Sequence, residues 1–136
     1  MRSALIVCIF LIFASSACAE VRIIAHPAVS PDTIKKADAV MIFLGKKTVW
    51  DNGEKIVPVI LRSGASHEAF LKDVVEKTSA QFSTYWKQYA FWGKGKEPKS
   101  FDSEADLVKY VSETKWAVGY ADDAALSSSV KVLIIE

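Results

Sequence analysis

Apolar residues alternate with polar ones in some segments of the chain and recur at helical spacing in others. Alternation rich in β-branched residues predicts strands over residues 21–25, 55–61, 117–120 and 130–135. Recurrence every three or four residues predicts helices between these strands. Because strands and helices alternate along the chain, the predicted fold class is α/β, with a mixed sheet flanked by helices.

The first predicted helix has clear signals at both ends. Ser30 is the expected N-cap, Pro31 occupies the first helical position, and Gly45 is the expected C-cap. The apolar positions between these ends are Ile34, Ala37 and Met41. The sequence therefore predicts a β-loop-α start.

Three further helices are predicted. One follows Ser66, the next begins at a capping-box pattern over residues 78–81, and the last begins at Ser103, with Asp106 in its first turn. Their expected core residues are Phe70, Leu71, Val74 and Val75, then Phe82, Tyr85, Trp86, Tyr89 and Ala90, then Leu107, Val108 and Val111.

Residues 48–61 carry a hairpin signal. Asn52 and Gly53 tolerate the positive φ that a tight turn needs, and apolar segments flank them. Pro58 has no N–H to donate to a ladder, so we expect it at an edge or bulged position of the returning strand.

The first 19 residues have the pattern of a secretory signal peptide. Arg2 gives a basic start, residues 4–13 form an apolar core, and residues 17–19 are small. The apolar core is shorter than the roughly 20 residues that span a bilayer. We therefore expect cleavage after Ala19, a periplasmic location, and one mature domain over residues 20–136.

An alternative is a lipoprotein in which Cys18 becomes the lipidated first residue. Ser15 stands where such signals usually have leucine, which favours simple cleavage. Cleavage after Ala19 would remove both Cys8 and Cys18, so neither a disulfide nor thiol catalysis is expected.

The charge balance argues against some partners. Loss of Arg2 leaves 16 basic and 16 acidic residues, and this balance does not favour nucleic acid or an anionic membrane surface. The aromatic content is that of a folded domain with a proper core. An anion site, if present, must be local.

The strongest chemical signal lies where the strand over residues 55–61 meets the next helix. A guanidinium can bind two oxyanion oxygens, and hydroxyl groups and the N–H groups of a helix start supply further donors. The simpler alternative is a routine N-cap at Ser66, with Arg62 solvated or paired to an acid, and with Glu68 complementing the helix dipole. The candidate ligand-binding residues are Arg62, Ser63, Gly64, Ser66 and, from the loop after the first strand, Ser30.

The other candidate motifs favour structural roles. Residues 45–47 and 93–96 combine glycine with lysine but lack the spacing of a P-loop, so a helix cap and a surface loop are expected. His26 and His67 form no metal-binding spacing, and adjacent Ser66 and His67 do not make a catalytic triad. We therefore expect no enzyme activity, metal or cofactor. Trp92 is the tryptophan that we single out for partner binding.

Five short segments occur in a recognisable order. They are residues 42–47 (IFLGKK), 50–53 (WDNG), 57–59 (VPV), 68–70 (EAF) and 118–120 (VGY). Their combination behind a signal peptide resembles the phosphate-type periplasmic substrate-binding proteins of ABC transporters. It is most similar to the short members of that superfamily, which are one lobe long (a PBP-like domain).

This resemblance implies that Arg62, Ser63, Gly64 and Ser66 hold the oxygens of phosphate. Full-length relatives close two lobes over the ligand, and the mature chain has length for one. A second copy in a homodimer, an ABC transporter permease or a membrane sensor would then complete the site. The leading hypothesis is an exported solute-binding protein that binds phosphate or a similar small oxyanion without catalysis. The alternative is an envelope interaction or sensory adaptor module that has lost ligand binding.

Overall fold

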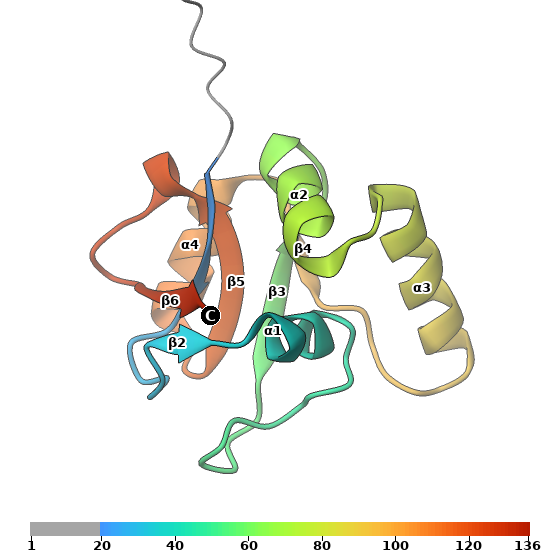
Figure 1. The fold of residues 1–136 in the computed structure, drawn as a ribbon, viewed down its shortest axis with the longest axis horizontal. Coiled ribbons are helices and arrows are strands. Elements are labelled where there is room, and N and C mark those ends of the chain that lie inside the picture. Colours follow the sequence, from blue (N-terminus) through green and yellow to red (C-terminus); the bar gives the residue numbers. More distant parts are fainter. Residues whose placement is uncertain (1–19) are drawn as a thin grey trace, which may run out of the picture.

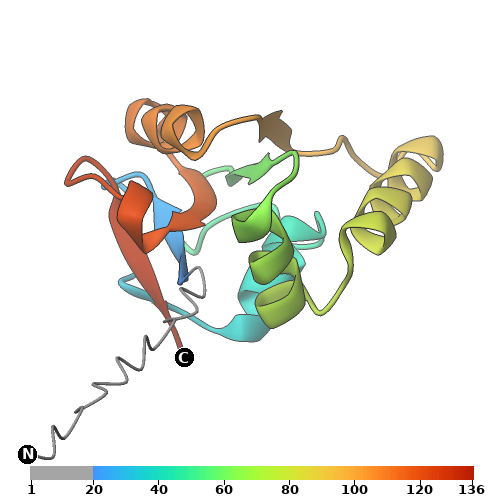
Figure 2. The same ribbon diagram turned by 90° about the horizontal axis from the view of Figure 1, so that it is seen from above.

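The structure, a computed structural model, describes residues 20–136 of the chain. The predicted signal peptide, with Cys8, Cys18 and the cleavage position after Ala19, lies outside the described residues. Over residues 20–136, strands and helices alternate and build a mixed sheet with helices on both faces (Figure 1, Figure 2). The predicted α/β fold class is confirmed.

Six strands form the sheet, in the spatial order β2-β6-β1-β5-β3-β4. They are β1 (Val21–Ala25), β2 (Thr33–Ile34), β3 (Val57–Leu61), β4 (Lys99–Phe101), β5 (Ala117–Asp122) and β6 (Lys131–Ile135). β1 runs antiparallel to its neighbours β5 and β6, whereas β3 runs parallel to β5 and β4. The C-terminal ends of β3 and β5 therefore lie at the same end of the sheet as the start of β1.

Helices cover both faces of this sheet. They are α1 (Lys36–Phe43), α2 (Ala65–Phe70) with its π-helical continuation η1 (Leu71–Val75), α3 (Ser79–Phe91), α4 (Glu104–Glu113) and the 3₁₀ turn η2 (Asp123–Ala125). Tyr120 of β5 packs against Phe43 of α1 and Phe70 of α2, with ring centroids 5.9 and 3.9 Å apart. The adjacent Gly119 faces α4, where a Cβ would lie 3.0 Å from Leu107. In both views α3 lies to the side of the sheet, beyond its β4 edge (Figure 1, Figure 2).

Most of the local predictions are confirmed. The capping box joins Thr78 and Gln81 through two hydrogen bonds of 3.0 and 3.1 Å, and the Ser103 hydroxyl accepts from the Asp106 N–H. Gly45 adopts a φ of 75° directly after the C-cap of α1. The predicted core residues of α2, η1 and α4 are buried, namely Phe70, Leu71, Val74, Val75, Leu107, Val108 and Val111.

The predicted start of the first helix is wrong. α1 begins at Lys36, and Ser30 and Pro31 lie in the loop before it. Thr33 and Ile34 instead form β2, which pairs with β6, and the Glu136 N–H donates to the Ile34 carbonyl at 2.9 Å. The closing strand thus takes the backbone groups that a longer helix would have used.

The predicted hairpin is reduced to one antiparallel bridge between Val49 and Lys55. Gly53 has the expected positive φ of 84°. Pro58 does not lie in an edge strand, because β3 has β5 on one side and β4 on the other. The Val57 N–H donates towards β5, so position 58 faces the β4 side, where pairing begins only at Val59. The missing N–H of Pro58 therefore breaks no ladder bond.

The predicted apolar face of α3 is only partly buried. Phe82 and Trp86 are buried, Tyr85 and Tyr89 are half-buried, and Ala90 is exposed. α3 lies beside the sheet, and no second layer covers this helix along its whole length, so part of its apolar face stays exposed.

Candidate functional site

The turn between β3 and α2 leaves a helix start without a side-chain cap. Its N-cap is Gly64, with φ 105° and ψ 174°, a conformation that favours glycine. Gly64 has no side chain to accept a hydrogen bond, and no acceptor within residues 20–136 takes the N–H groups of Ala65, Ser66 and His67. The expected N-cap role of Ser66 is wrong, because Ser66 lies inside the first turn. Three backbone donors remain available at this end of the sheet.

Two of these donors, the N–H groups of Ala65 and Ser66, belong to residues that line a hollow of about 270 Å³. Ser63, Gly64 and Ser66, three of the predicted site residues, line it together. Ser66 is buried and is one of the residues that line the hollow. The other lining residues are Leu61, Ala65, Asp102 and Glu104.

Arg62 lies beside the hollow and is paired with an acid. Its N–H donates to the Phe101 carbonyl at 2.9 Å, as the last link between β3 and β4. Its guanidinium forms an ion pair with Asp102 and donates to the Ser100 hydroxyl at 3.4 Å. Both charged side chains are more than half exposed, so this ion pair contributes little to stability. The paired arrangement is the simpler alternative considered from the sequence.

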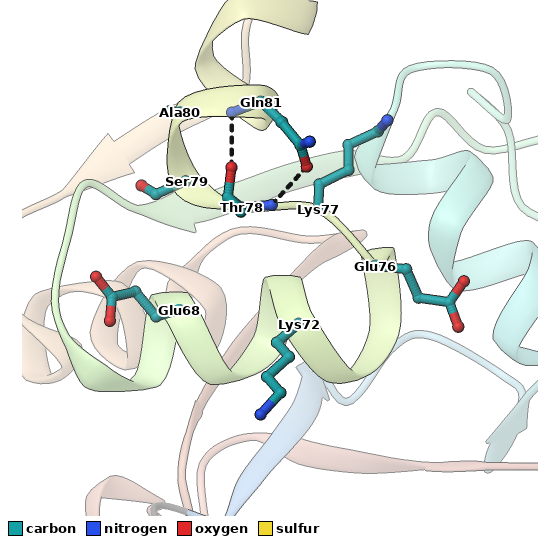
Figure 3. A pocket seen from close by; sticks show the side chains of 8 residues that line it. All are labelled: Glu68, Lys72, Glu76, Lys77, Thr78, Ser79, Ala80 and Gln81. Atoms are coloured by element: carbon teal, nitrogen blue, oxygen red, sulfur yellow. Dashed lines mark hydrogen bonds between the residues drawn. The ribbon is translucent and has the colours of Figure 1, made fainter.

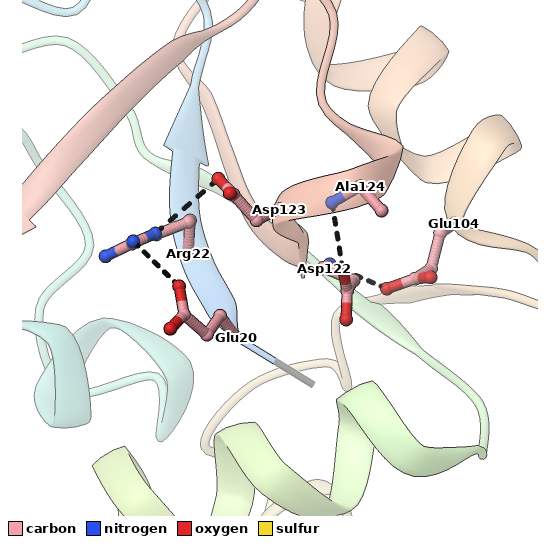
Figure 4. A network of polar contacts seen from close by, with 6 residues as sticks. All are labelled: Glu20, Arg22, Glu104, Asp122, Asp123 and Ala124. Atoms are coloured by element: carbon pink, nitrogen blue, oxygen red, sulfur yellow. Dashed lines mark hydrogen bonds and ion pairs between the residues drawn. The ribbon is translucent and has the colours of Figure 1, made fainter. Parts of the chain in front are cut away.

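Glu104 brings a second carboxylate to the hollow, and a backbone N–H holds it. The Asp122 N–H donates to Glu104 at 2.8 Å, and the Asp122 carboxylate accepts from the Ala124 N–H at 2.9 Å (Figure 4). Asp122 ends β5, which places this network at the same end of the sheet as Arg62. The site therefore combines free backbone donors and one arginine with two carboxylates.

A buried chain of hydrogen bonds lies under the turn. The Leu61 N–H donates to the Tyr120 hydroxyl at 3.0 Å, and this hydroxyl is 2.5 Å from His67 Nδ1. The direction of the Tyr120–His67 bond depends on the imidazole tautomer: with the His67 proton on Nε2, the Tyr120 hydroxyl donates to Nδ1. No local sequence pattern indicates this pairing, since Tyr120 and His67 are joined only by the packing of α2 on β5.

Burial favours the neutral forms of the His67 and Tyr120 side chains. Desolvation lowers the pKa of His67, and the nearby Glu68 carboxylate opposes this shift. Desolvation also raises the pKa of Tyr120 well above its ordinary value, and the hydrogen bond from Leu61 opposes that shift. Burial therefore favours a neutral imidazole and a protonated hydroxyl.

Ser30 does not join the other predicted site residues. β1 runs antiparallel to β5, so the loop after β1 lies at the opposite end of the sheet from Arg62. There Ser30 borders a separate hollow of about 250 Å³, together with Trp50 and Trp116. The expectation that Ser30 shares a cleft with Arg62 is wrong.

A larger hollow of about 670 Å³ lies between α2–η1 and the start of α3 (Figure 3). Glu68 lines this hollow and does not line the one beside Arg62. Lys72 and Lys77 are offset there by Glu68 and Glu76. The capping box satisfies the Thr78 and Gln81 N–H groups, whereas the N–H groups of Ser79 and Ala80, which also line this hollow, have no acceptor within residues 20–136.

The described part of the chain contains neither a metal-binding cluster nor a membrane-spanning helix. Within residues 20–136, no group of three His, Cys, Asp or Glu side chains is placed to hold a metal ion. None of the helices in this range has both the length and the apolar character to cross a bilayer.

The fold resembles solved structures, although the sequence matches no protein-family profile and no curated protein. A protein assigned as a phosphate ABC transporter substrate-binding protein from Clostridium perfringens, solved with bound phosphate, matches with a TM-score of 0.67 at 18% identity. PstS from Borrelia burgdorferi matches with a TM-score of 0.65 at 16% identity. An ABC-type phosphate transport receptor from Vibrio cholerae matches with a TM-score of 0.58 at 15% identity.

Each of these matches includes 85% of this chain but less than half of the other protein. The shares of the other chains are 44%, 47% and 45%, in the same order. The described fold is therefore similar to about half of such a binding protein. At these identities the similarity shows the fold, and the site has to be argued from its own residues.

Proposed function

We propose that this chain binds a small oxyanion in the hollow beside Arg62, without catalysis. The observation that carries this proposal is the uncapped start of α2, where the N–H groups of Ala65, Ser66 and His67 have no acceptor. Backbone N–H groups at a helix start favour negative charge, and Ser63 and Ser66, which carry further donors, line the same hollow.

Arg62 would provide the fixed positive charge. Its guanidinium is exposed and has more donors than its contacts with Asp102 and Ser100 use. An oxyanion at the turn can therefore share the guanidinium with Asp102. The turn that connects the end of β3 to the start of α2 is short, so the charge of Arg62 stays close to the backbone donors.

The two carboxylates favour an oxyanion that still carries a proton. An ionised carboxylate only accepts hydrogen bonds, so Asp102 and Glu104 repel sulfate but can accept an O–H from hydrogen phosphate. The phosphate-related names of the structural neighbours agree with this choice. Phosphate is therefore the proposed ligand, in preference to sulfate.

The proposed setting is that of an exported receptor. The neighbours are described as transport receptors and substrate-binding proteins, and the predicted signal peptide would direct this chain to the periplasm. The hollow is open to solvent, so a second copy, an ABC transporter permease or a membrane sensor would have to cover a bound ligand. Light scattering with and without phosphate tests the homodimer, which requires a mass increase.

Isothermal titration of residues 20–136 with phosphate and sulfate tests the binding proposal. A charge-assisted hydrogen bond contributes about 1.5–3 kcal/mol, so Arg62→Ala should weaken phosphate binding about tenfold or more. Arg22→Ala is the matched control, because Arg22 is also exposed and paired with acids, Glu20 and Asp123 (Figure 4). No heat from either anion, or equal affinity in Arg62→Ala, would sink the proposal.

A second candidate function is the envelope interaction or sensory adaptor module. The Arg62–Asp102 ion pair favours it, because the guanidinium already has a counterion without any ligand. A negative titration together with co-purification of a defined membrane protein would support this candidate. Phosphate binding that depends on Arg62 would exclude an adaptor module that has lost ligand binding.

A further inference from the structure

The end of α3 exposes two large aromatic side chains. Phe91 is 86% exposed and Trp92 is 63% exposed, although apolar side chains of this size are usually buried. They are consecutive in sequence, Phe91 as the last residue of α3 and Trp92 as its C-cap. Adjacent exposed aromatic residues of this kind mark interaction sites more often than single ones do.

This patch is held rigidly. Gly93 has a φ of 67°, its N–H donates to the Ala90 carbonyl at 3.0 Å, and the Lys94 N–H donates to the Tyr89 carbonyl at 3.1 Å. These two bonds form a Schellman motif, which fixes the last turn. Tyr89 in turn donates to the Gly45 carbonyl at 3.2 Å, so α3 is tied to the body of the protein. The aromatic side chains are thus presented by a structured helix end.

Lysines surround the two aromatic residues. Lys87 lies one helical turn before Phe91, Lys94 Nζ lies 5.5 Å from the centre of the Trp92 ring, and Lys96 follows in the exposed loop. None of these three lysines forms an ion pair with any residue in the range 20–136. Glu97 is the one acid in this stretch of sequence. The local charge is positive, although the whole domain is balanced.

We propose that this aromatic tip, defined as Phe91, Trp92, Lys87, Lys94 and Lys96, binds the surface of an anionic lipid bilayer. Tryptophan partitions to the headgroup region, and lysines beside it attract anionic lipids. A protein partner fits less well, because lysine is depleted from protein interfaces. The tip lines neither the hollow beside Arg62 nor the larger hollow beside Glu68, and its exposed side chains can enter the surface of a bilayer. This surface is independent of the proposed oxyanion site.

Vesicle co-sedimentation of residues 20–136 tests the proposal. This segment contains the whole described fold and omits the apolar residues 4–13, which would themselves bind lipid. We expect binding to vesicles of equal parts phosphatidylglycerol and phosphatidylcholine, and much weaker binding to pure phosphatidylcholine. Trp92 fluorescence should shift to the blue on binding, because it is the most exposed tryptophan of the described chain.

Two double variants separate the apolar and charged contributions. Phe91→Ser with Trp92→Ser should reduce vesicle affinity at least tenfold. Lys94→Gln with Lys96→Gln should reduce it by a similar amount at low salt, since each lysine near an anionic surface is worth about fivefold. Both changes lie on the surface, so circular dichroism and the unfolding midpoint should stay unchanged.

Matched controls keep the test specific. Ile134→Ser removes apolar surface at a side chain that is 64% exposed on β6, and Lys72→Gln with Lys109→Gln removes two exposed lysines elsewhere. Both controls should bind like the wild type. The proposal is overturned if vesicles are not bound, if the tip variants bind as well as the controls, or if light scattering shows that the tip instead joins two copies of the chain.

Discussion

Helices α1 and α3 end with the same local structure in two different environments. α1 ends at Phe43, Leu44 and Gly45, and α3 ends at Phe91, Trp92 and Gly93, in each case followed by lysine. In both, the glycine has a positive φ, 75° and 67°, and the same pair of Schellman hydrogen bonds closes the last turn. A local motif therefore fixes where each helix stops.

The environments of the two ends differ almost completely. Phe43 is fully buried and Leu44 is 7% exposed, whereas Phe91 and Trp92 are exposed. The difference arises because α3 itself covers the end of α1: a Cβ at Gly45 would lie 2.7 Å from Trp86, while nothing lies within 4 Å of one at Gly93. The comparison teaches that the motif sets the turn, and that only the neighbouring elements decide which pair of apolar side chains becomes core and which stays available to a partner.

The largest expected effect is at Phe43. Phe43→Ala should lower the free energy of unfolding by about 3–5 kcal/mol, because it opens a cavity beside the stacked rings of Phe70 and Tyr120. Phe91→Ala should change it by less than about 0.5 kcal/mol, as at other exposed positions. Urea unfolding of both variants measures the difference. Equal losses would mean that the two helix ends are packed alike.

The second expected effect separates backbone conformation from packing. Gly93→Ala should cost about 1–2 kcal/mol, the usual penalty for a left-handed alanine. Gly45→Ala should cost about 1–3 kcal/mol more, since the new methyl group would also collide with Trp86. Thermal and urea unfolding report both values. If Gly45→Ala were no worse than Gly93→Ala, α3 would not cover the end of α1 as described.

Sequence reasoning succeeded where the structure depends on neighbouring residues. The capping box at Thr78 and Gln81 could be predicted, because its two hydrogen bonds join residues three apart. The start of α1 could not, because Thr33 and Ile34 pair with β6, about a hundred residues later in the chain. The exposure of Phe91 could not be predicted either, since it depends on where α3 packs.

The same distinction applies to the candidate site. Ser63, Gly64 and Ser66 come together because they belong to one turn. Asp102 arrives at Arg62 only through the pairing of β3 with β4, and no local pattern indicates that pairing. Ser30 was placed wrongly because the antiparallel direction of β1 cannot be read from its own residues.

The third prediction concerns the other end of α3, where Phe82 packs edge to face on the buried His67, with ring centroids 6.1 Å apart. Burial lowers the pKa of His67 in the folded protein below its unfolded value of about 6.5. Between these two values the unfolded chain binds more protons, so stability should fall as the pH drops below about 6.5 and should stop falling below the lowered pKa.

Urea unfolding from pH 7.5 to pH 5 measures this dependence, and His67→Gln provides the comparison. Glu68 is the charged neighbour that opposes the shift, so Glu68→Gln should widen the pH range of the effect. The wild type should lose stability over this range, whereas His67→Gln should lose less. Parallel slopes in the two proteins would exclude His67 as the titrating group.

The smallest expected effect tests how α3 holds the end of α1. Tyr85 donates to the Leu44 carbonyl at 2.7 Å, and this carbonyl is one that the helix end leaves without an intrahelical partner. Tyr85→Phe should therefore cost about 0.5–1.5 kcal/mol, the usual net value of such a bond. Tyr110→Phe is the control, because its half-buried ring packs on Phe101 and no hydrogen bond of its hydroxyl is found within residues 20–136. A loss confined to Tyr85→Phe would show that α3 stabilises the end of α1 by a directed contact, and equal values would reduce its role to covering apolar surface.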